Sequence, residues 1–129
     1  MQTTFKLFFS FLFCLALLLV GGCDKIEKTI EERRAQANQR VVFSYIQELT
    51  QQVERFALDV GRPPTTEEGL AALVSCPPNV PENKWAGPYI KSTSIPRDPW
   101  GNEYQYVSPG IDGSNFHIWS FGPDGNNWD

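Results

Sequence analysis

The most regular pattern of apolar positions in this chain lies between residues 41 and 60. Apolar side chains recur there at alternating steps of four and three residues, as on one face of an α-helix: Val42, Ile46, Leu49, Val53, Phe56 and Val60. Gly61 and Pro63 follow at once and cannot continue a helix. We therefore predict an amphipathic helix that packs on a sheet. A coiled-coil seam is the alternative, although the pattern runs for fewer than about three heptads.

A second, shorter helix is predicted in residues 64–74. Thr65 or Thr66 can cap its N-terminus, and Glu67 and Glu68 then lie in the first turn, where the helix dipole favours negative charge. The side chains expected to face inward are Leu70, Leu73 and Val74. The proline-rich stretch that follows is predicted as a loop.

The C-terminal part of the chain has the pattern of short strands. Residues 87–92 fit an edge strand, and residues 103–108 and 116–122 fit the two strands of a hairpin. These two strands each place large side chains on one face: Tyr104, Tyr106, Phe116 and Ile118. The helix needs a sheet to cover, and the sheet needs a helix on one face. We predict an α+β fold, with a long N-terminal helix packed on a small antiparallel sheet of about three strands.

The first 23 residues form a separate apolar segment. No charge lies between Lys6 and Asp24, and residues 7–20 are apolar at all but one position. This run is shorter than the roughly 20 residues that span a bilayer core, and it fits the apolar part of a signal peptide. The letters VGGC, which end at Cys23, resemble a lipobox. We predict that residues 1–22 are a signal peptide and that Cys23 carries lipid, such as palmitate; an uncleaved membrane anchor is the alternative.

A lipid on Cys23 would place the protein in a bacterial cell envelope, with its folded part in the periplasm. Asp24 beside it resembles an inner-membrane retention signal of enteric lipoproteins. Residues 23–40 are charged and rich in helix formers, and they are predicted to form a helical stalk. Residues 41–129 would then form the head domain.

Composition excludes some classes of function. The net charge of −4 argues against a nucleic-acid-binding protein, which needs a basic surface to neutralise phosphates. An enzyme is not expected, because the single histidine, His117, lies in a predicted strand and nothing positions a nucleophile beside it. Cys76 would be the one cysteine left besides Cys23, so no internal disulfide is expected.

Four segments of the chain are similar, in order, to the major pseudopilin of type II secretion systems. They read ALDVGRPPTTEEGLAALV, GPYIK, DPWGNEYQYVSPG and SFGPDG. The similarity covers roughly residues 56–125. It implies a type IV pilin-like head and assembly into a short periplasmic fibre that helps to push folded proteins through an outer-membrane channel. Its partners would be other pseudopilins or secretion-apparatus proteins.

The N-terminal end departs from the pattern of that family. A pseudopilin keeps an apolar helix, with a glutamate five residues into it, and this helix packs the core of the fibre; here no acidic residue precedes Asp24. We therefore expect a membrane-tethered lipoprotein with a pseudopilin-like head, acting as a structural or accessory component in protein secretion. The alternatives are a periplasmic protein-binding module unrelated to secretion, and a true pseudopilus subunit that retains the apolar segment.

The resemblance also implies a calcium site in the C-terminal loop. Asp124 would supply a side-chain ligand, Phe121 a backbone carbonyl, and Asp129 a further carboxylate. Calcium takes six to eight oxygens, and the alternative is a polar turn that caps the hairpin. Trp85 and Trp128 lie in predicted loops, and we expect them to contact a protein partner.

Overall fold

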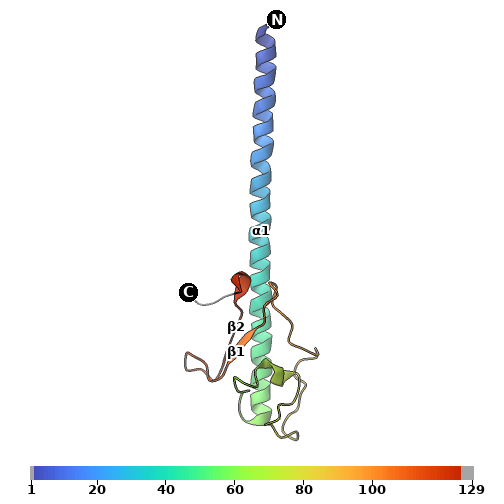
Figure 1. Ribbon diagram of the computed structural model, residues 1–129, viewed down its shortest axis with the longest axis vertical. Coiled ribbons are helices and arrows are strands. Elements are labelled where there is room, and N and C mark those ends of the chain that lie inside the picture. Colours follow the sequence, from blue (N-terminus) through green and yellow to red (C-terminus); the bar gives the residue numbers. More distant parts are fainter. Residues whose placement is uncertain (1, 126–129) are drawn as a thin grey trace. The chain divides into compact units, whose positions relative to one another are not determined.

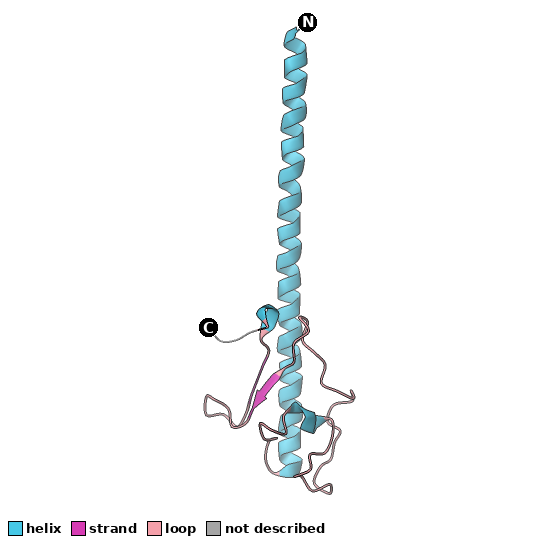
Figure 2. Cartoon of the chain, viewed as in Figure 1, coloured by secondary structure: helices cyan, strands magenta, loops and turns pink. Residues whose placement is uncertain are grey.

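The longest element of the chain is the helix α1, Gln2–Val60. The computed structural model describes the backbone of residues 2–125 and the side chains of residues 25–125. Two strands follow α1 in the chain, β1 (Gln105–Val107) and β2 (His117–Trp119). Figure 1 labels these elements, and Figure 2 colours the chain by secondary structure. Two short 3₁₀ helices complete the described elements, at Leu70–Leu73 and Gly122–Asp124. The chain divides into two compact units, Met1–Gln39 and Arg40–Asp129, and the second is called the head below.

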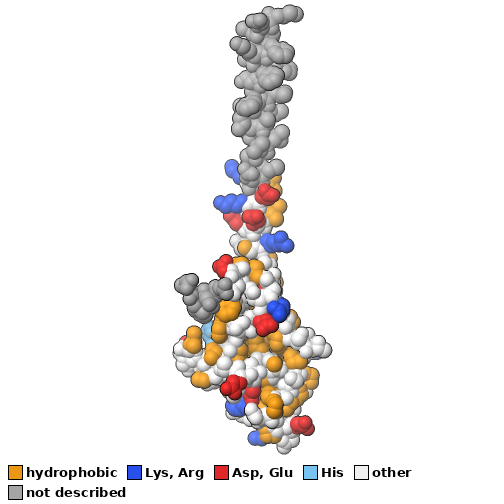
Figure 3. Space-filling model, in the orientation of Figure 1, with side chains coloured by type: hydrophobic (Ala, Val, Ile, Leu, Met, Phe, Trp, Pro, Cys, Tyr) orange, Lys and Arg blue, Asp and Glu red, His pale blue; other side chains and the backbone are white. Residues whose placement is uncertain are grey.

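In the first unit, every side chain from residue 25 to residue 37 is exposed. Ile26 and Ile30 are 62% and 59% exposed, and charged side chains are spread over this surface (Figure 3). Over these described residues, the apolar side chains of the helix are therefore open to solvent. Among the residues whose side chains are described, no helix combines the length and the apolar character needed to cross a membrane.

Within the head, α1 buries the face that the sequence pattern predicts. Leu49, Val53 and Phe56 are fully buried, and they pack with Tyr104 and Ile118 of the hairpin. Side chains at the ends of the same stripe are partly buried against this core: Val42, Ile46 and Val60. The helix-on-sheet arrangement is therefore confirmed. Burial of such a stripe is the main source of stability for a small α+β domain, at roughly 1.5–3 kcal/mol for each large apolar side chain.

The sheet has two strands rather than about three. β1 and β2 pair antiparallel, with Tyr106 opposite Ile118. The third strand predicted in residues 87–92 does not form. The backbone N–H groups of Tyr89 and Ile90 both donate to the carbonyl of Leu73, at 2.8 and 3.3 Å, so they are not available for a strand ladder. This segment packs side chains into the core instead of pairing its backbone.

The two faces of the hairpin are as predicted. Tyr104 and Ile118 are buried, and the rings of Tyr106 and Phe116 stack on the same face with centroids 6.0 Å apart. The opposite face carries a second aromatic row, in which successive ring centroids lie 5.6 and 6.3 Å apart: His117, Trp119 and Phe121. The alternation of a strand thus supplies both the core and an outer aromatic surface.

The predicted helix over residues 64–74 is shorter than expected. A turn at residues 66–69 leads into a 3₁₀ helix of four residues, Leu70–Leu73. Gly69 adopts φ +57°, outside the α region, and this conformation separates the turn from the 3₁₀ helix. Leu70 and Leu73 are buried, as predicted, whereas Val74 is only partly buried.

Candidate functional site

The turn before the 3₁₀ helix is organised around the carboxylate of Glu68. Arg62 donates two hydrogen bonds to it, at 2.7 and 2.8 Å, and the Glu68 side chain is only 6% exposed. The N–H of Thr65 donates to Glu68 at 2.8 Å, while the N–H of Glu68 donates to the Thr65 hydroxyl at 3.2 Å. This reciprocal pair is a capping box. The hydrogen bonds from Arg62 hold the pKa of Glu68 below its ordinary value, although desolvation opposes them.

The same turn is fastened to the end of β1. The hydroxyl of Thr66 donates to the carbonyl of Ser108 and accepts from its N–H, both at 3.0 Å. The Tyr106 hydroxyl donates to the carbonyl of Pro64 at 2.7 Å. Burial raises the pKa of Tyr106 to about 12, so the hydroxyl keeps its proton at neutral pH. These contacts place the turn against the sheet. The sequence pattern indicated a cap at Thr65 or Thr66 but not their separate partners.

A second buried carboxylate, Asp98, organises the turn before β1. It is 5% exposed, and one of its oxygens accepts from the N–H groups of Trp100 and Asn102, at 3.0 and 2.8 Å. Its other oxygen accepts from the Ser120 hydroxyl at 2.6 Å. Desolvation raises the pKa of Asp98, but the hydrogen bonds from Ser120 and the backbone lower it by more. The pKa of Asp98 therefore lies below its ordinary value. Sequence reasoning identified a turn here but missed the contact with Ser120.

The predicted calcium loop forms a short turn beside Asp98. Phe121 precedes the 3₁₀ helix Gly122–Asp124, and Asp124 is exposed. Among the described residues, no group of three acidic, histidine or cysteine side chains is placed to hold a metal. Phe121 and Asp124 would supply two of the six to eight oxygens that calcium takes. These two residues alone therefore do not complete the coordination of a calcium ion. Asp129 lies outside them, so the calcium site stays a prediction.

Trp85, one of the two predicted partner contacts, is half-buried in the head. Its indole N–H donates to the carbonyl of Ala72 at 3.0 Å, and its ring meets Tyr89 edge to face at 5.9 Å. A side chain at Gly87 would collide with this ring, because an added Cβ would lie 2.5 Å from it. Trp85 thus fastens the proline-rich loop to the 3₁₀ helix. Contact with a partner stays a prediction for Trp85, and Trp128 lies outside the described residues.

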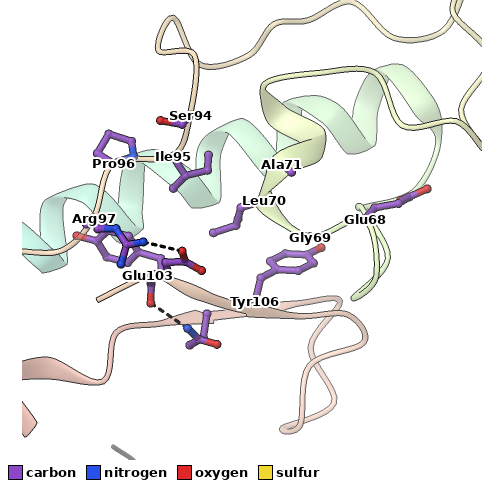
Figure 4. A pocket seen from close by; sticks show the side chains of 12 residues that line it. Glu68, Gly69, Leu70, Ala71, Ser94, Ile95, Pro96, Arg97, Glu103 and Tyr106 are labelled. Atoms are coloured by element: carbon purple, nitrogen blue, oxygen red, sulfur yellow. Dashed lines mark hydrogen bonds and ion pairs between the residues drawn. The ribbon is translucent and has the colours of Figure 1, made fainter. Parts of the chain in front are cut away.

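A groove with a volume of about 480 Å³ lies between three segments, residues 68–71, 94–97 and 103–106 (Figure 4). Arg97 and Glu103 pair across one side of it at 3.0 Å, and their side chains are 62% and 73% exposed. Exposed pairs of this kind contribute little stability. The groove contains no nucleophile beside a base and no described cluster of metal ligands.

The predicted lipidation site lies outside the side chains that the structure describes. Cys23 and Asp24 belong to residues 1–24, of which only the backbone of residues 2–24 is described. The lipid on Cys23 and the placement at the inner membrane therefore stay predictions.

The fold and the sequence were compared with those of known proteins. The family model "Type II secretion system (T2SS), protein G" matches residues 29–128. The type II secretion system core protein G of Dickeya chrysanthemi is 44% identical over 94 residues, which is 71% of this chain and 60% of that protein. The corresponding protein of Vibrio cholerae is 41% identical over 93 residues, 71% of this chain and 62% of that protein. This chain therefore matches less than two thirds of the length of these relatives.

A solved structure agrees with the sequence matches. The crystal structure of the major pseudopilin from the type 2 secretion system of enterohaemorrhagic Escherichia coli superimposes with a TM-score of 0.62 at 39% sequence identity. The match covers 73% of this chain and 82% of that chain. The resemblance predicted from four sequence segments is confirmed. The long helix packed on an antiparallel hairpin is the pseudopilin fold, and this chain belongs to the family of type II secretion system protein G.

Proposed function

We propose that this protein is a structural component of a type II secretion apparatus in a bacterial cell envelope, and that its head contacts other pseudopilins or secretion proteins. The observation that supports this most strongly is the family match over residues 29–128, which includes the whole described head. The head also offers two little-exposed structural carboxylates, Asp98 and Glu68, and a packed aromatic hairpin.

We further propose that the protein is attached to the membrane by a lipid on Cys23. The apolar residues 7–20, the small residues before Cys23 and the absence of any acidic residue before Asp24 support this proposal. A lipoprotein of this kind would lose the apolar helix that packs the core of a pseudopilus. It would therefore act beside the fibre, as an accessory component, rather than inside it.

The first experiment compares the native protein with a Cys23→Ser variant by intact mass spectrometry and membrane fractionation. A mature chain that begins at Cys23 and carries acyl chains, absent from the variant, would support the lipid anchor. A chain that retains residues 7–20 would contradict it and would favour a true pseudopilus subunit.

A second experiment tests the role in secretion itself. We expect deletion of the gene to reduce export of the substrates of the host's type II system, and the wild-type gene to restore it. Normal export in the deletion strain would instead favour a protein-binding module unrelated to secretion. The Cys23→Ser variant in the same assay tells whether the anchor is needed for that role.

A further inference from the structure

The edge of β1 that faces away from β2 carries backbone groups with no strand beside them. In an antiparallel pair, successive residues turn their N–H and C=O groups alternately toward the partner strand and away from it. Ser108, just after β1, turns both groups to the Thr66 hydroxyl, at 3.0 Å each, and not to β2. By this alternation, the N–H and the carbonyl of Tyr106 point to the same outer edge. Among residues 25–125, no hydrogen bond occupies either group on that edge.

The groove described above lies along this outer edge. Its described lining includes residues 103–106 but no residue of β2, and its other walls are residues 68–71 and 94–97. Figure 4 shows the side chains of Leu70 and Ile95 in the space between these segments, on the side of the Tyr106 ring. The volume of about 480 Å³ lies within the roughly 300–1,000 Å³ of known ligand sites. The free edge of β1 therefore borders a space that can receive another stretch of chain.

The side chains around the groove indicate which residues such a stretch would carry. When a strand pairs with a free edge, residues directly opposite each other place their side chains on the same face of the sheet. A residue opposite Tyr106 would therefore direct its side chain toward Leu70, which is 7% exposed, and Ile95, which is partly buried. Apolar side chains at alternate positions suit this surface.

The charged groups of the groove are already paired within the head. Arg62 neutralises Glu68, and Arg97 neutralises Glu103. The groove thus offers no unpaired charge of its own to attract a charged peptide, and what it offers is the backbone edge and the apolar wall. The Arg97–Glu103 pair is exposed at both side chains, and such pairs are weak enough to open as a chain enters.

We propose that β1 accepts an extended, uncharged peptide segment of a partner protein as an additional strand. The segment pairs its backbone with Tyr106 and places apolar side chains, at alternate positions, against Leu70 and Ile95. Backbone hydrogen bonds supply the affinity in this mode of recognition, and the side-chain pockets supply the specificity. The inference goes beyond the proposed role in secretion and does not rest on it, because it is decided by peptide binding and not by export.

The test follows amide hydrogen exchange by NMR in the full chain. In the protein alone, we expect the Tyr106 amide to exchange about tenfold faster than the amides of Gln105 and Val107, which pair with β2. Equal protection at the three positions would show that the outer edge is already occupied and would overturn the proposal. Protection of Tyr106 that rises with protein concentration would assign the edge to a second copy of the chain and would also overturn it.

Two peptides of one sequence then probe the edge, each about eight residues long with alternating valine and threonine. One is N-methylated at the threonines, so that the valines keep the N–H groups needed to pair with β1 while their side chains face the apolar wall. The other is N-methylated at the valines and cannot pair in this way. At millimolar concentration, the first should slow exchange at Tyr106 by about tenfold and the second should leave it unchanged. Equal effects of the two peptides, including no effect of either, would overturn the proposal.

A matched pair of variants tests the apolar wall. Ile95→Asn should weaken binding of the first peptide by about tenfold, because a polar side chain replaces an apolar contact of the bound valine. Ile111→Asn is the control, since Ile111 is 73% exposed in the hairpin loop and does not line the groove, and it should bind the peptide like the wild type. Equal binding by the two variants would contradict the proposed placement. Amides of α1 near Phe56 report whether Ile95→Asn stays folded, and if it does not, the two peptides decide alone.

Discussion

Glu68 and Asp98 each have a little-exposed carboxylate that organises a turn in the head, but their negative charges are compensated in different ways. Glu68 pairs with a cation, Arg62, whose side chain is itself 39% exposed. Asp98 is satisfied by neutral donors from the backbone and from Ser120. A small domain can therefore bury a negative charge with or without a counter-charge, provided that its oxygens are hydrogen-bonded.

Acidification should have the largest effect, because it acts on both carboxylates at once. The pKa of Glu68 lies below its ordinary 4.5 and that of Asp98 below its ordinary 3.8, so the unfolded chain binds protons more readily than the head. Their stabilisation is therefore complete above about pH 5 and is lost as the pH falls through the lowered values. Urea unfolding at several pH values measures this loss, and a free energy of unfolding that stays flat below about pH 4 would contradict it.

Removal of the Asp98 carboxylate should cost more than any other single change at these centres. We expect Asp98→Ala to lower the free energy of unfolding by about 3 kcal/mol, because several donors lose a buried acceptor together. Asp112→Ala is the control, since Asp112 binds Ser114 in a similar way but is exposed, and it should change stability little. Equal losses in the two variants would mean that burial is not what makes Asp98 important.

Glu68→Gln should have a smaller effect. Glutamine keeps the shape and one acceptor oxygen but leaves Arg62 without its ion pair, so we expect a loss of about 2 kcal/mol in chemical denaturation. The exposed neighbour Glu67 provides the control, because Glu67→Gln should leave stability nearly unchanged. A loss for Glu68→Gln that equals the loss for Asp98→Ala would remove the distinction between the two centres.

Salt should have the smallest effect on the stabilities compared here, and it should act on Glu68 but not on Asp98. Between about 0.1 and 1 M sodium chloride, the difference in stability between the wild type and Glu68→Gln should shrink by about 0.5 kcal/mol, because the partly exposed Arg62 is screened. The difference between the wild type and Asp98→Ala should stay constant, since no cation pairs with Asp98 among the described contacts. If salt reduced the stability difference equally for Glu68→Gln and for Asp98→Ala, this explanation would be contradicted.

The sequence predicts the parts of the fold that depend on neighbouring positions. The helical stripe through Val53 and the alternation of Tyr104 and Tyr106 are local patterns, and the structure contains them. A capping threonine was predicted at position 65 or 66, and Thr65 accepts from the N–H of Glu68, although in a turn rather than at the start of a helix. The four segments similar to the major pseudopilin also identified the family correctly. Local spacing was enough in each case because the interacting groups lie within a few residues of one another.

The sequence could not predict contacts that depend on distant partners. The link from Ser120 to Asp98 spans 22 positions, and neither residue shows by its type which partner it will meet. The prediction of a third strand in residues 87–92 was wrong for the same reason. Tyr89 and Ile90 have strand-like character, but the nearby carbonyl of Leu73 takes their N–H groups, and only the folded chain brings it there.

The loop between β1 and β2 closes mainly on itself. Gly110 and Ser114 are joined by a backbone bond of 2.9 Å, Asp112 binds Ser114, and residues 111–115 are exposed. Neither buried carboxylate is bonded to this loop. For an engineer it is therefore the place on the described head to insert an affinity tag or a fluorescent label, since an inserted peptide can leave through solvent without pulling on the core.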